Sequence, residues 1–412
     1  METLHYRPSE SDIVKTVFPT DGRPLMVQHT PEADPVSAPL FWAKQGCPRE
    51  IINKIIKPDG TWGIVVDDVI NPYEMRPRVL MSTLTEPLKP VYIGNTYSLH
   101  GARKYFNEHD LRHHMWVGSQ GIKFLEEGGY DKKIQLVAAA AAAVHDTGNI
   151  VSREAQARVS CEILKITFPN LKFTQEDMDE VLWTILHHDE PSVTRLLGGG
   201  PLRFDDIPEV HGERLERMKN IKKPAWWAVA GADKKDITRR RVSPLAEDIR
   251  AMESSPHTET YALFDTDTRQ LRRKGDVFNW NMHFKPDLSP AEFEDNIAYT
   301  MGIRGESGLP KVYVPQDTHD RYLIEGIPHF YSTLEKLTQI HEGRFIISAY
   351  TQLALHDDLK QVNISFHDGG QKIFKIVAER IQRGIVFRKS ELAYTSHPHH
   401  PSNKPPKLLF LK

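Results

Sequence analysis

Residues 132–149 read KKIQLVAAAAAAVHDTGN, and the rest of the chain is best understood from this stretch. The six alanines at 138–143 combine high helix propensity with side chains so small that neighbouring helices can pack closely all round. Asp131 can cap the first turn, and the Thr-Gly-Asn segment at 147–149 can end the helix, because glycine readily takes the left-handed conformation there. The stretch therefore predicts a buried helix that ends at His145 and Asp146, where a bending backbone can bring both side chains to one point.

Composition excludes several classes of protein. With 412 residues the chain is long enough for two or three domains, and 39% apolar with 26% charged residues is typical of a soluble globular protein. A formal net charge of −2 gives no overall attraction to nucleic acid or to a membrane. The two cysteines, Cys47 and Cys161, provide neither a disulfide framework nor a cysteine-based zinc site. No apolar run reaches the ~18 residues of a membrane span and no signal-peptide core opens the chain, so we expect a cytoplasmic protein.

The sequence divides into three regions. Residues 1–100 are expected to form an arm or a small β region, with short β-like runs between 62 and 99. Residues 101–250 show helical periodicity, interrupted at 192–223 by a stretch interpreted as a mobile flap or a disordered connection. Residues 251–412 suggest an α+β accessory domain, with helices at 327–341 and 372–383, a strand at 361–366, an extended segment at 385–388 and an ambiguous segment at 344–356. The expected fold class is mainly α, with a central all-helical domain and α+β flanking regions.

A His-Asp pair alone is not informative, because the chain has several others, among them those at 109–110, 319–320, 356–357 and 367–368. The pair at 145–146 differs in having suitable partners on flanking segments. Residues 110–127 carry an apolar stripe at helical spacing, and His113 lies beside that stripe, with His114 as the rival candidate. We therefore expect His113, or His114 in its place, to face the His145-Asp146 pair.

Two later helices add a histidine and an aspartate. A capping pattern opens a helix at Thr174, and His188 falls on the apolar face of that helix. In the helix that Pro224 starts, Asp233 lies on the apolar stripe, where an unpaired carboxylate is costly and a cation is needed. Asp236, three residues further on, falls off this stripe and is not expected to affect the metal.

These side chains together predict a metal site, formed by His113, His145, Asp146 and Asp233, with His187 and His188 beside it. Imidazole and carboxylate ligands suit Mn, Fe, Co, Ni, Zn or Mg. Each residue alone has a simpler explanation. His113 could lie at the surface or the edge of the core, His188 could donate to a backbone carbonyl, and Asp233 could pair with a nearby arginine. The coincidence of all of them favours the metal.

The order of these residues resembles the HD-domain superfamily of metal-dependent phosphohydrolases. The matching motifs are RHHMWVG for the first histidine, AAAVHDTGN for the pair and AVAGADKKD for the last aspartate. In the family the first histidine is followed four residues later by Val and then Ala or Gly, which favours His113 over His114. ILHHDEP resembles the double histidine of binuclear members. The resemblance covers roughly residues 101–250 and implies an all-helical HD domain.

Three departures from the family bear on mechanism. Many members read HDxGK, with a lysine placed to contact phosphate, whereas this chain has Asn149. Binuclear members carry a further histidine soon after the pair, where this chain has Gln156 and Arg158, so one metal is expected. The GYP signature of cyclic-dinucleotide phosphodiesterases is missing.

The resemblance implies a phosphohydrolase acting on a phosphorylated small molecule or nucleotide. Asp146 would orient or deprotonate the attacking water, and His187 or His188 would contact the phosphate or act as general acid. Arg195, Lys234 or a neighbouring arginine would replace the missing lysine, and the sequence does not choose among them. The alternatives are a non-catalytic HD sensor or scaffold, a mixed-valent di-iron oxygenase of the HD fold, and an HD nuclease, although no helicase motif accompanies the domain. We expect no membrane partner and no clear nucleic-acid surface, and association into a homo-oligomer stays open.

Overall fold

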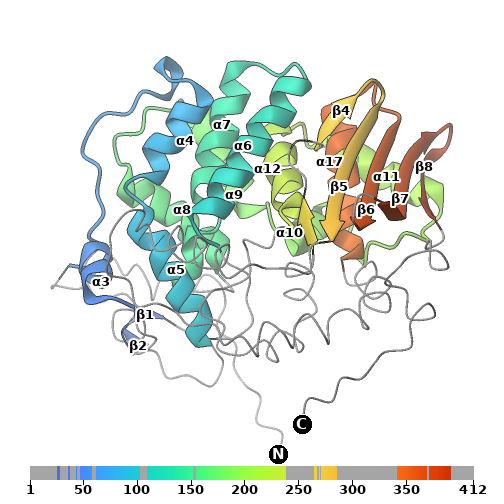
Figure 1. Ribbon diagram of the computed structural model, residues 1–412. Helices are drawn as coiled ribbons and strands as arrows, with labels where there is room; N and C mark the ends of the chain where they lie inside the picture. Colours follow the sequence, from blue (N-terminus) through green and yellow to red (C-terminus); the bar gives the residue numbers. More distant parts are fainter. Residues whose placement is uncertain are drawn as a thin grey trace, which may run out of the picture. The chain divides into compact units, whose positions relative to one another are not determined.

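The computed structural model describes residues 26–27, 36–37, 43, 47–57, 62–102, 109–151, 155–237, 264–266, 269, 271–284, 341–368 and 371–390 (Figure 1). The chain falls into two compact units. The first consists of Met1–Val193, Lys222–Asp236 and Tyr299–Arg304, and the second of Thr194–Ile221, Ile237–Ala298 and Gly305–Lys412. The boundary expected at residue 250 lies outside the described residues, and so does the helix expected at 327–341 except for its last residue.

The first unit is helical in its described part, apart from one short antiparallel strand pair. Its elements are β1 (Met26–Val27), β2 (Val36–Ser37), α3 (Arg49–Ile55), η1 (Pro72–Glu74), α4 (Pro77–Thr85), α5 (Lys89–Ala102), α6 (Leu111–Glu127), α7 (Lys132–Val144), η2 (Thr147–Ile150), α8 (Gln156–Thr167), α9 (Gln175–Leu186) and α12 (Pro224–Lys235). Helix α10 (Glu190–Leu196) crosses from the first unit to the second. The expected mainly α class is confirmed.

Helix α7 is the centre of the first unit, as its sequence predicts. Helices α4, α6, α9 and α12 all contact it, and every alanine from Ala138 to Ala143 is buried. The carboxylate of Asp131 caps the helix by accepting from the Ile134 amide over 3.0 Å. The alanine run therefore allows close packing on all sides of α7.

The β-like runs expected between 77 and 99 are wrong, whereas Trp62 and Ile70 make only isolated β-bridges. Residues 77–85 and 89–102 form helices α4 and α5, and residue 100, where a domain boundary was expected, lies inside α5. Apolar runs such as Leu80-Met81 and Val91-Tyr92 fit a buried helix as well as a strand, and all four side chains are buried here. Tertiary packing, rather than the local pattern, decides between the two.

The second unit combines helices and a sheet, as the α+β expectation requires. Its elements are α11 (Pro208–Asn220), β3 (Phe264–Thr266), β4 (Arg272–Lys274), β5 (Val277–Phe284), α17 (Glu342–Leu355), β6 (Gln361–Asp368), β7 (Gln371–Ile381) and β8 (Gly384–Lys389). The six-stranded sheet has the order β3-β5-β6-β7-β8, and β4 also pairs with β5. Strands β5 and β6 are parallel, whereas the other neighbours are antiparallel.

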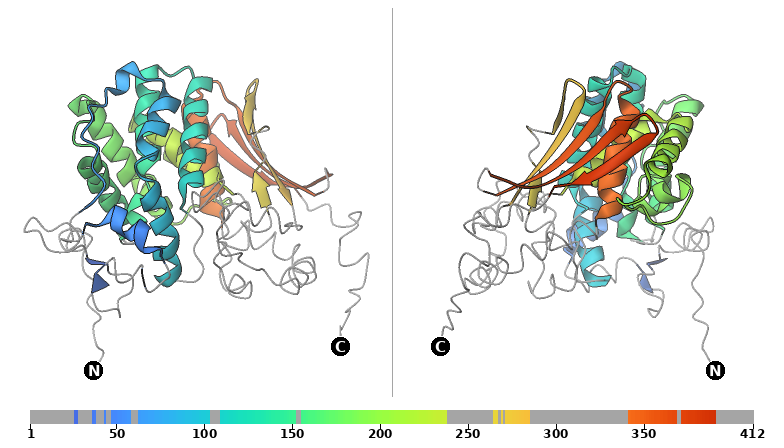
Figure 2. Two further views of the ribbon diagram at one scale, coloured as in Figure 1. Left: turned by 60° about the vertical axis from the view of Figure 1, so that its left-hand side comes forward. Right: turned by 90° about the vertical axis from the view of Figure 1, so that its right-hand side faces the viewer.

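One face of this sheet is apolar and packs on α17. Trp280 on β5 and Phe366 on β6 both contact Phe345 of the helix, with ring centroids 5.5 and 5.9 Å apart. Figure 2 shows α17 and α11 on this side of the sheet. The strand residues that alternate with the buried apolar ones lie on the other face and are mostly polar or charged, with Val277, Val377 and Val386 among them.

One prediction in the second unit is wrong, and two are confirmed. Residues 372–383 were expected to be helical, but 371–381 form strand β7, in which the buried Phe374, Ile376 and Ala378 alternate with less buried residues. The strand at 361–366 and the extended segment at 385–388 are confirmed as β6 and β8, and the ambiguous segment at 344–356 is mostly α17.

The stretch at 192–223 is not a structureless flap, because it contains part of α10 and all of α11. Helix α11 approaches β8 so closely that a Cβ on Gly384 would lie 1.9 Å from the Pro208 carbonyl oxygen. Within the described residues, no helix is long and apolar enough to cross a membrane.

Candidate metal centre

Four of the predicted ligands meet at one point in the first unit. His113 lies on α6, His145 and Asp146 follow α7 directly, and Asp233 lies near the end of α12. One ligand atom from each of the four lies within 4.8 Å of the others, and all four residues are buried. The structure selects His113 over His114, whose Nδ1 donates to the Asp110 carbonyl over 2.8 Å.

The turn after α7 is fixed by hydrogen bonds to its backbone. The Ser160 hydroxyl donates to the His145 carbonyl over 3.0 Å and accepts from the Gly148 amide over 2.8 Å. The Asp146 carbonyl accepts from the side-chain amides of Asn149 and Asn95 over 3.0 and 3.3 Å. The two metal-ligand candidates are therefore placed by a rigid turn rather than a loose loop.

Glycine is required at position 148. A Cβ there would lie 2.0 Å from the Gln156 carbonyl oxygen and 2.8 Å from the Ser160 amide nitrogen. Real Cβ atoms do not approach backbone atoms so closely, so only glycine lets α8 pack against this turn. The left-handed conformation expected at Gly148 is wrong, because the chain continues into η2 with no positive φ there, and the glycine is needed for close packing instead.

The two ligand histidines have defined tautomers. His113 donates from Nδ1 to Asp236 Oδ2 over 2.7 Å, and His145 donates from Nδ1 to the Ala142 carbonyl over 2.9 Å. Carboxylate and carbonyl oxygens only accept, so each Nδ1 carries a proton, and whenever the ring is neutral its lone pair is on Nε2. Burial lowers the pKa of His145, which favours its neutral ring. The two Nε2 atoms face each other across 3.1 Å.

The carboxylates surround these lone pairs. Asp146 Oδ2 lies 3.3 Å from His145 Nε2 and 3.5 Å from His113 Nε2, and Asp233 Oδ1 lies 3.3 Å from His113 Nε2. Burial alone would raise the pKa of Asp146, but the adjacent His145 and His109 outweigh it and hold that pKa well below its usual range. Asp146 is therefore an anion in a buried site.

The donor set fits a divalent metal. Imidazole nitrogen and carboxylate oxygen bind such ions at about 2.0–2.2 Å, so ligand atoms on one ion lie at most about 4.4 Å apart. The observed limit of 4.8 Å needs only a small contraction. Two imidazole lone pairs and two carboxylates could thus hold one ion, and this donor set suits Mn, Fe, Co, Ni or Zn better than Mg.

His188 reaches the same centre, whereas the ring of His187 packs against another side chain. His188 donates from Nδ1 to the Ile185 carbonyl over 2.7 Å and places Nε2 3.2 Å from Asp146 Oδ1. Burial would lower the pKa of His188, but Asp146 outweighs it and raises that pKa. The His187 ring packs against Trp183, with ring centroids 4.2 Å apart.

Two residues of the centre were missed from sequence. Asp236 was expected to be irrelevant to the metal, but it is buried and holds His113, because α12 ends at Lys235 and a residue beyond the helix no longer follows the helical stripe. His109 Nε2 lies 3.5 Å from Asp146 Oδ2. The only sequence signal for His109 was its place just before the helix that carries His113.

The structure also distinguishes the cations considered as replacements for the family's lysine. The Asn149 side chain is buried, and its amide donates a hydrogen bond to the Asp146 carbonyl. Lys234 is buried, and its ammonium donates to Asp233 Oδ2. Lys235 is fully buried and donates to the Gly231 carbonyl over 3.1 Å, whereas Arg195 on α10 is exposed.

Comparison with known protein families, with curated proteins and with solved structures finds no match for this chain.

Proposed function

We propose that this chain is an HD-type, metal-dependent phosphohydrolase that acts on a phosphorylated small molecule or nucleotide. The observation that carries the proposal is the pair of facing Nε2 atoms of His113 and His145, 3.1 Å apart while both Nδ1 atoms donate elsewhere. Neutral rings in this arrangement cannot bond to each other, because each offers only a lone pair. A cation between them and the two aspartates resolves the conflict.

A divalent metal could be held by His113, His145, Asp146 and Asp233. It would polarise a phosphoryl oxygen and lower the pKa of a bound water. The first contribution of the chain's own residues is to orient the metal-binding histidines. Asp236 fixes the ring of His113 through Nδ1, and such second partners of metal-bound histidines set both tautomer and ring direction. Asp146 is also close enough to His188 to share a proton with it.

Lys234 is the proposed substrate cation. Its ammonium is held against Asp233, one of the proposed ligands, and the Coulomb influence of Lys234 also reaches Asp189, next to His188. A phosphoryl group at the centre would therefore lie beside a positive charge from Lys234, which would form charge-assisted hydrogen bonds to it. This assigns to Lys234 the task that Asn149 cannot perform.

His188 is the proposed proton donor to the leaving group. Its Nε2 lies at the centre, beside Asp146 Oδ1, and its Nδ1 is fixed by the Ile185 carbonyl. Of the two histidines considered, His187 is the poorer candidate because its ring packs on Trp183. General acid catalysis of this type typically contributes ~10²–10⁴ in rate.

The test is hydrolysis of a panel of phosphomonoesters, phosphodiesters and nucleotides, with Mn, Fe, Co, Ni, Zn or Mg supplied in turn and phosphate or product release measured. We expect metal-dependent turnover of at least one substrate, abolished in Asp146→Asn. A matched control is Asp131→Asn at the opposite end of α7, where Asn also caps a helix well, and it should keep full activity.

Lys234→Met should raise KM for the active substrate and leave the metal content unchanged. A metal-loaded wild type that hydrolyses none of these substrates would contradict the proposal and favour the non-catalytic scaffold. Turnover in Asp146→Asn equal to that of the wild type would contradict the assignment of the site.

A further inference from the structure

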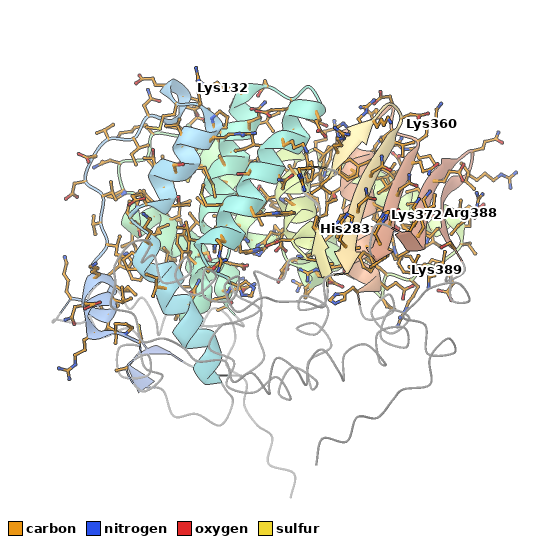
Figure 3. All side chains as sticks on the ribbon, viewed as in Figure 1. Lys132, His283, Lys360, Lys372, Arg388 and Lys389 are labelled. Carbon is orange, nitrogen blue, oxygen red and sulfur yellow. The ribbon has the colours of Figure 1, made fainter. Side chains whose placement is uncertain are left out.

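The sheet of the second unit has a second face, which we call the open face: the side of the sheet away from α17. Alternate residues of a strand point to opposite faces, so the neighbours of the buried Phe278 and Trp280 on β5 belong to the open face. Its charged residues are five cations and two acids: Arg272, Lys274, Lys372, Lys375, Arg388, Asp265 and Glu379. Figure 3 labels His283, Lys372 and Arg388 along this sheet.

The strand register brings these cations together. Arg272 on β4 lies opposite Asn279 on β5, and Lys372 on β7 lies opposite His367 on β6. Arg388 on β8 lies opposite Val377 of β7. Five neighbouring strands, from β4 to β8, span about 19 Å at the usual strand spacing. Residues far apart in the sequence thus meet on one face, where Val277, Val377 and Val386 lie among the polar side chains.

Charge on the open face is strongly one-sided. Arg272, Lys274, Lys372 and Arg388 are all exposed. The carboxylate of Glu379 pairs with Arg388 over 2.8 Å, and Asp265 occupies the register position opposite His283. The chain as a whole has a formal net charge of −2, so the excess of cations here is local rather than general.

The lysines on β7 crowd one another. Burial, together with the proximity of Lys372, lowers the pKa of Lys375, which means that this strand holds two like charges at a cost. Beside them, the rings of His283 and His367 stack with centroids 5.1 Å apart. An anionic partner that lies across β6 and β7 would relieve this repulsion.

We propose that the open face binds nucleic acid through its phosphodiester backbone. Arg and Lys side chains with amides such as Asn279 and Asn363 between them suit phosphate oxygens, which only accept hydrogen bonds. No aromatic residue other than histidine is described on this face, so binding relies on phosphates rather than base stacking and is independent of sequence. An acidic peptide would dock more readily by adding a strand to the edge of the sheet.

This proposal uses only residues of the second unit and does not depend on the metal centre. Composition alone predicted no clear nucleic-acid surface. The near-zero net charge conceals cations that come together only when β4, β7 and β8 join one sheet.

The test is fluorescence anisotropy of labelled 20-nucleotide single-stranded RNA, single-stranded DNA and duplex DNA with the full-length chain, between 50 and 200 mM KCl. The test variants are Lys372→Glu with Arg388→Glu, and independently Arg272→Glu with Lys274→Glu. The matched control is Lys54→Glu with Lys57→Glu, two exposed lysines in and just after α3 with the same change of charge. Circular dichroism melts establish that each variant folds.

The wild type should bind at least one of the three nucleic acids, with affinity that falls steeply as salt rises. Each test pair should weaken binding about tenfold or more and reduce the salt slope by about 1.4 for single strands, because two phosphate contacts are lost. The control should bind as the wild type does. Absence of binding to all three at 50 mM KCl, equal weakening in test and control variants, or stronger binding to poly-glutamate than to the oligonucleotides would overturn the proposal.

Discussion

The Nδ1 atom of His113 donates to the carboxylate of Asp236 across 2.7 Å, joining two buried residues that are 123 positions apart in the sequence. This bond fixes which nitrogen of His113 carries the proton, and it directs Nε2 toward Asp146 and Asp233. The geometry is that of a carboxylate that supports a metal-bound histidine. Asp236 is therefore part of the candidate metal centre although it is not one of the four ligand candidates.

Asp236→Ala should weaken metal binding by about 10–100-fold, the usual cost of losing such a support. Asp236→Asn should have a smaller effect, since the amide oxygen can still accept from Nδ1. The measurement is competition for the metal with a chromophoric chelator. Asp276→Ala removes an equally acidic but half-exposed carboxylate of the second unit and serves as the control. Equal affinities in Asp236→Ala and the control would contradict the role of Asp236.

His188→Ala should keep close to the wild-type metal content but lower kcat by about 10²–10⁴, because its proposed task is proton transfer. Metal content by mass spectrometry and kcat on the active phosphoester are measured on the same preparations. His187→Ala should change kcat little. A wild type that holds two metals, with only one left in His188→Ala, would instead make His188 a ligand, and bound iron would then favour the di-iron oxygenase.

Two glycine-to-alanine substitutions should act in opposite directions. Gly148→Ala forces a Cβ against the Gln156 carbonyl, so it should destabilise the chain by more than about 1 kcal/mol and disturb metal binding. Gly121→Ala places its Cβ at an ordinary 3.6 Å from Ala228 and should stabilise α6 by about 0.5–1 kcal/mol. Urea unfolding followed by circular dichroism measures both, and a stabilising Gly148→Ala would show that the turn is not tightly packed.

His211 makes a prediction about pH in the second unit. It is fully buried, its Nδ1 lies 2.6 Å from the Tyr350 hydroxyl, and burial lowers its pKa. A folded-state pKa below the unfolded value of about 6.5 means that the unfolded chain binds the proton more readily, so stability falls as pH drops below about 6.5. His211→Gln should lose less stability between pH 7 and pH 5 than the wild type, by at most about 1.4 kcal/mol per pH unit.

Urea titrations at pH 7, 6 and 5 test this prediction. Tyr350→Phe is the matched control, because it removes the partner hydroxyl but keeps the titrating imidazole. It should therefore retain the pH dependence of the wild type. A His211→Gln slope equal to that of the wild type would show that His211 does not contribute to acid sensitivity.

Much of the helical unit could be predicted because its signals are local. Asp110, Asp131 and Thr174 all cap the helices that were expected to start there. Asp233 was found from its place on an apolar stripe, since a buried carboxylate conflicts with its surroundings unless a cation is near. These arguments need only the periodicity of one helix.

The rest depends on contacts between distant segments. Asp236 follows the end of α12, so its direction is set by where the helix stops rather than by helical phase. Residues 371–381 were misread because an alternating strand with Lys and Glu between apolar residues also fits a helical pattern over one or two turns. The choice is made by pairing with β6 and β8, which no local pattern records.

The central claim is that His113, His145, Asp146 and Asp233 hold one divalent metal. The most direct measurement is the metal stoichiometry, by inductively coupled plasma mass spectrometry, of wild type, Asp146→Asn and Asp131→Asn purified without chelator. We expect about one transition-metal ion per chain in the wild type and in Asp131→Asn, and none in Asp146→Asn, with circular dichroism unchanged in all three. Equal metal content in the wild type and Asp146→Asn, or a folded wild type that binds no metal even when each ion is supplied, would contradict the account.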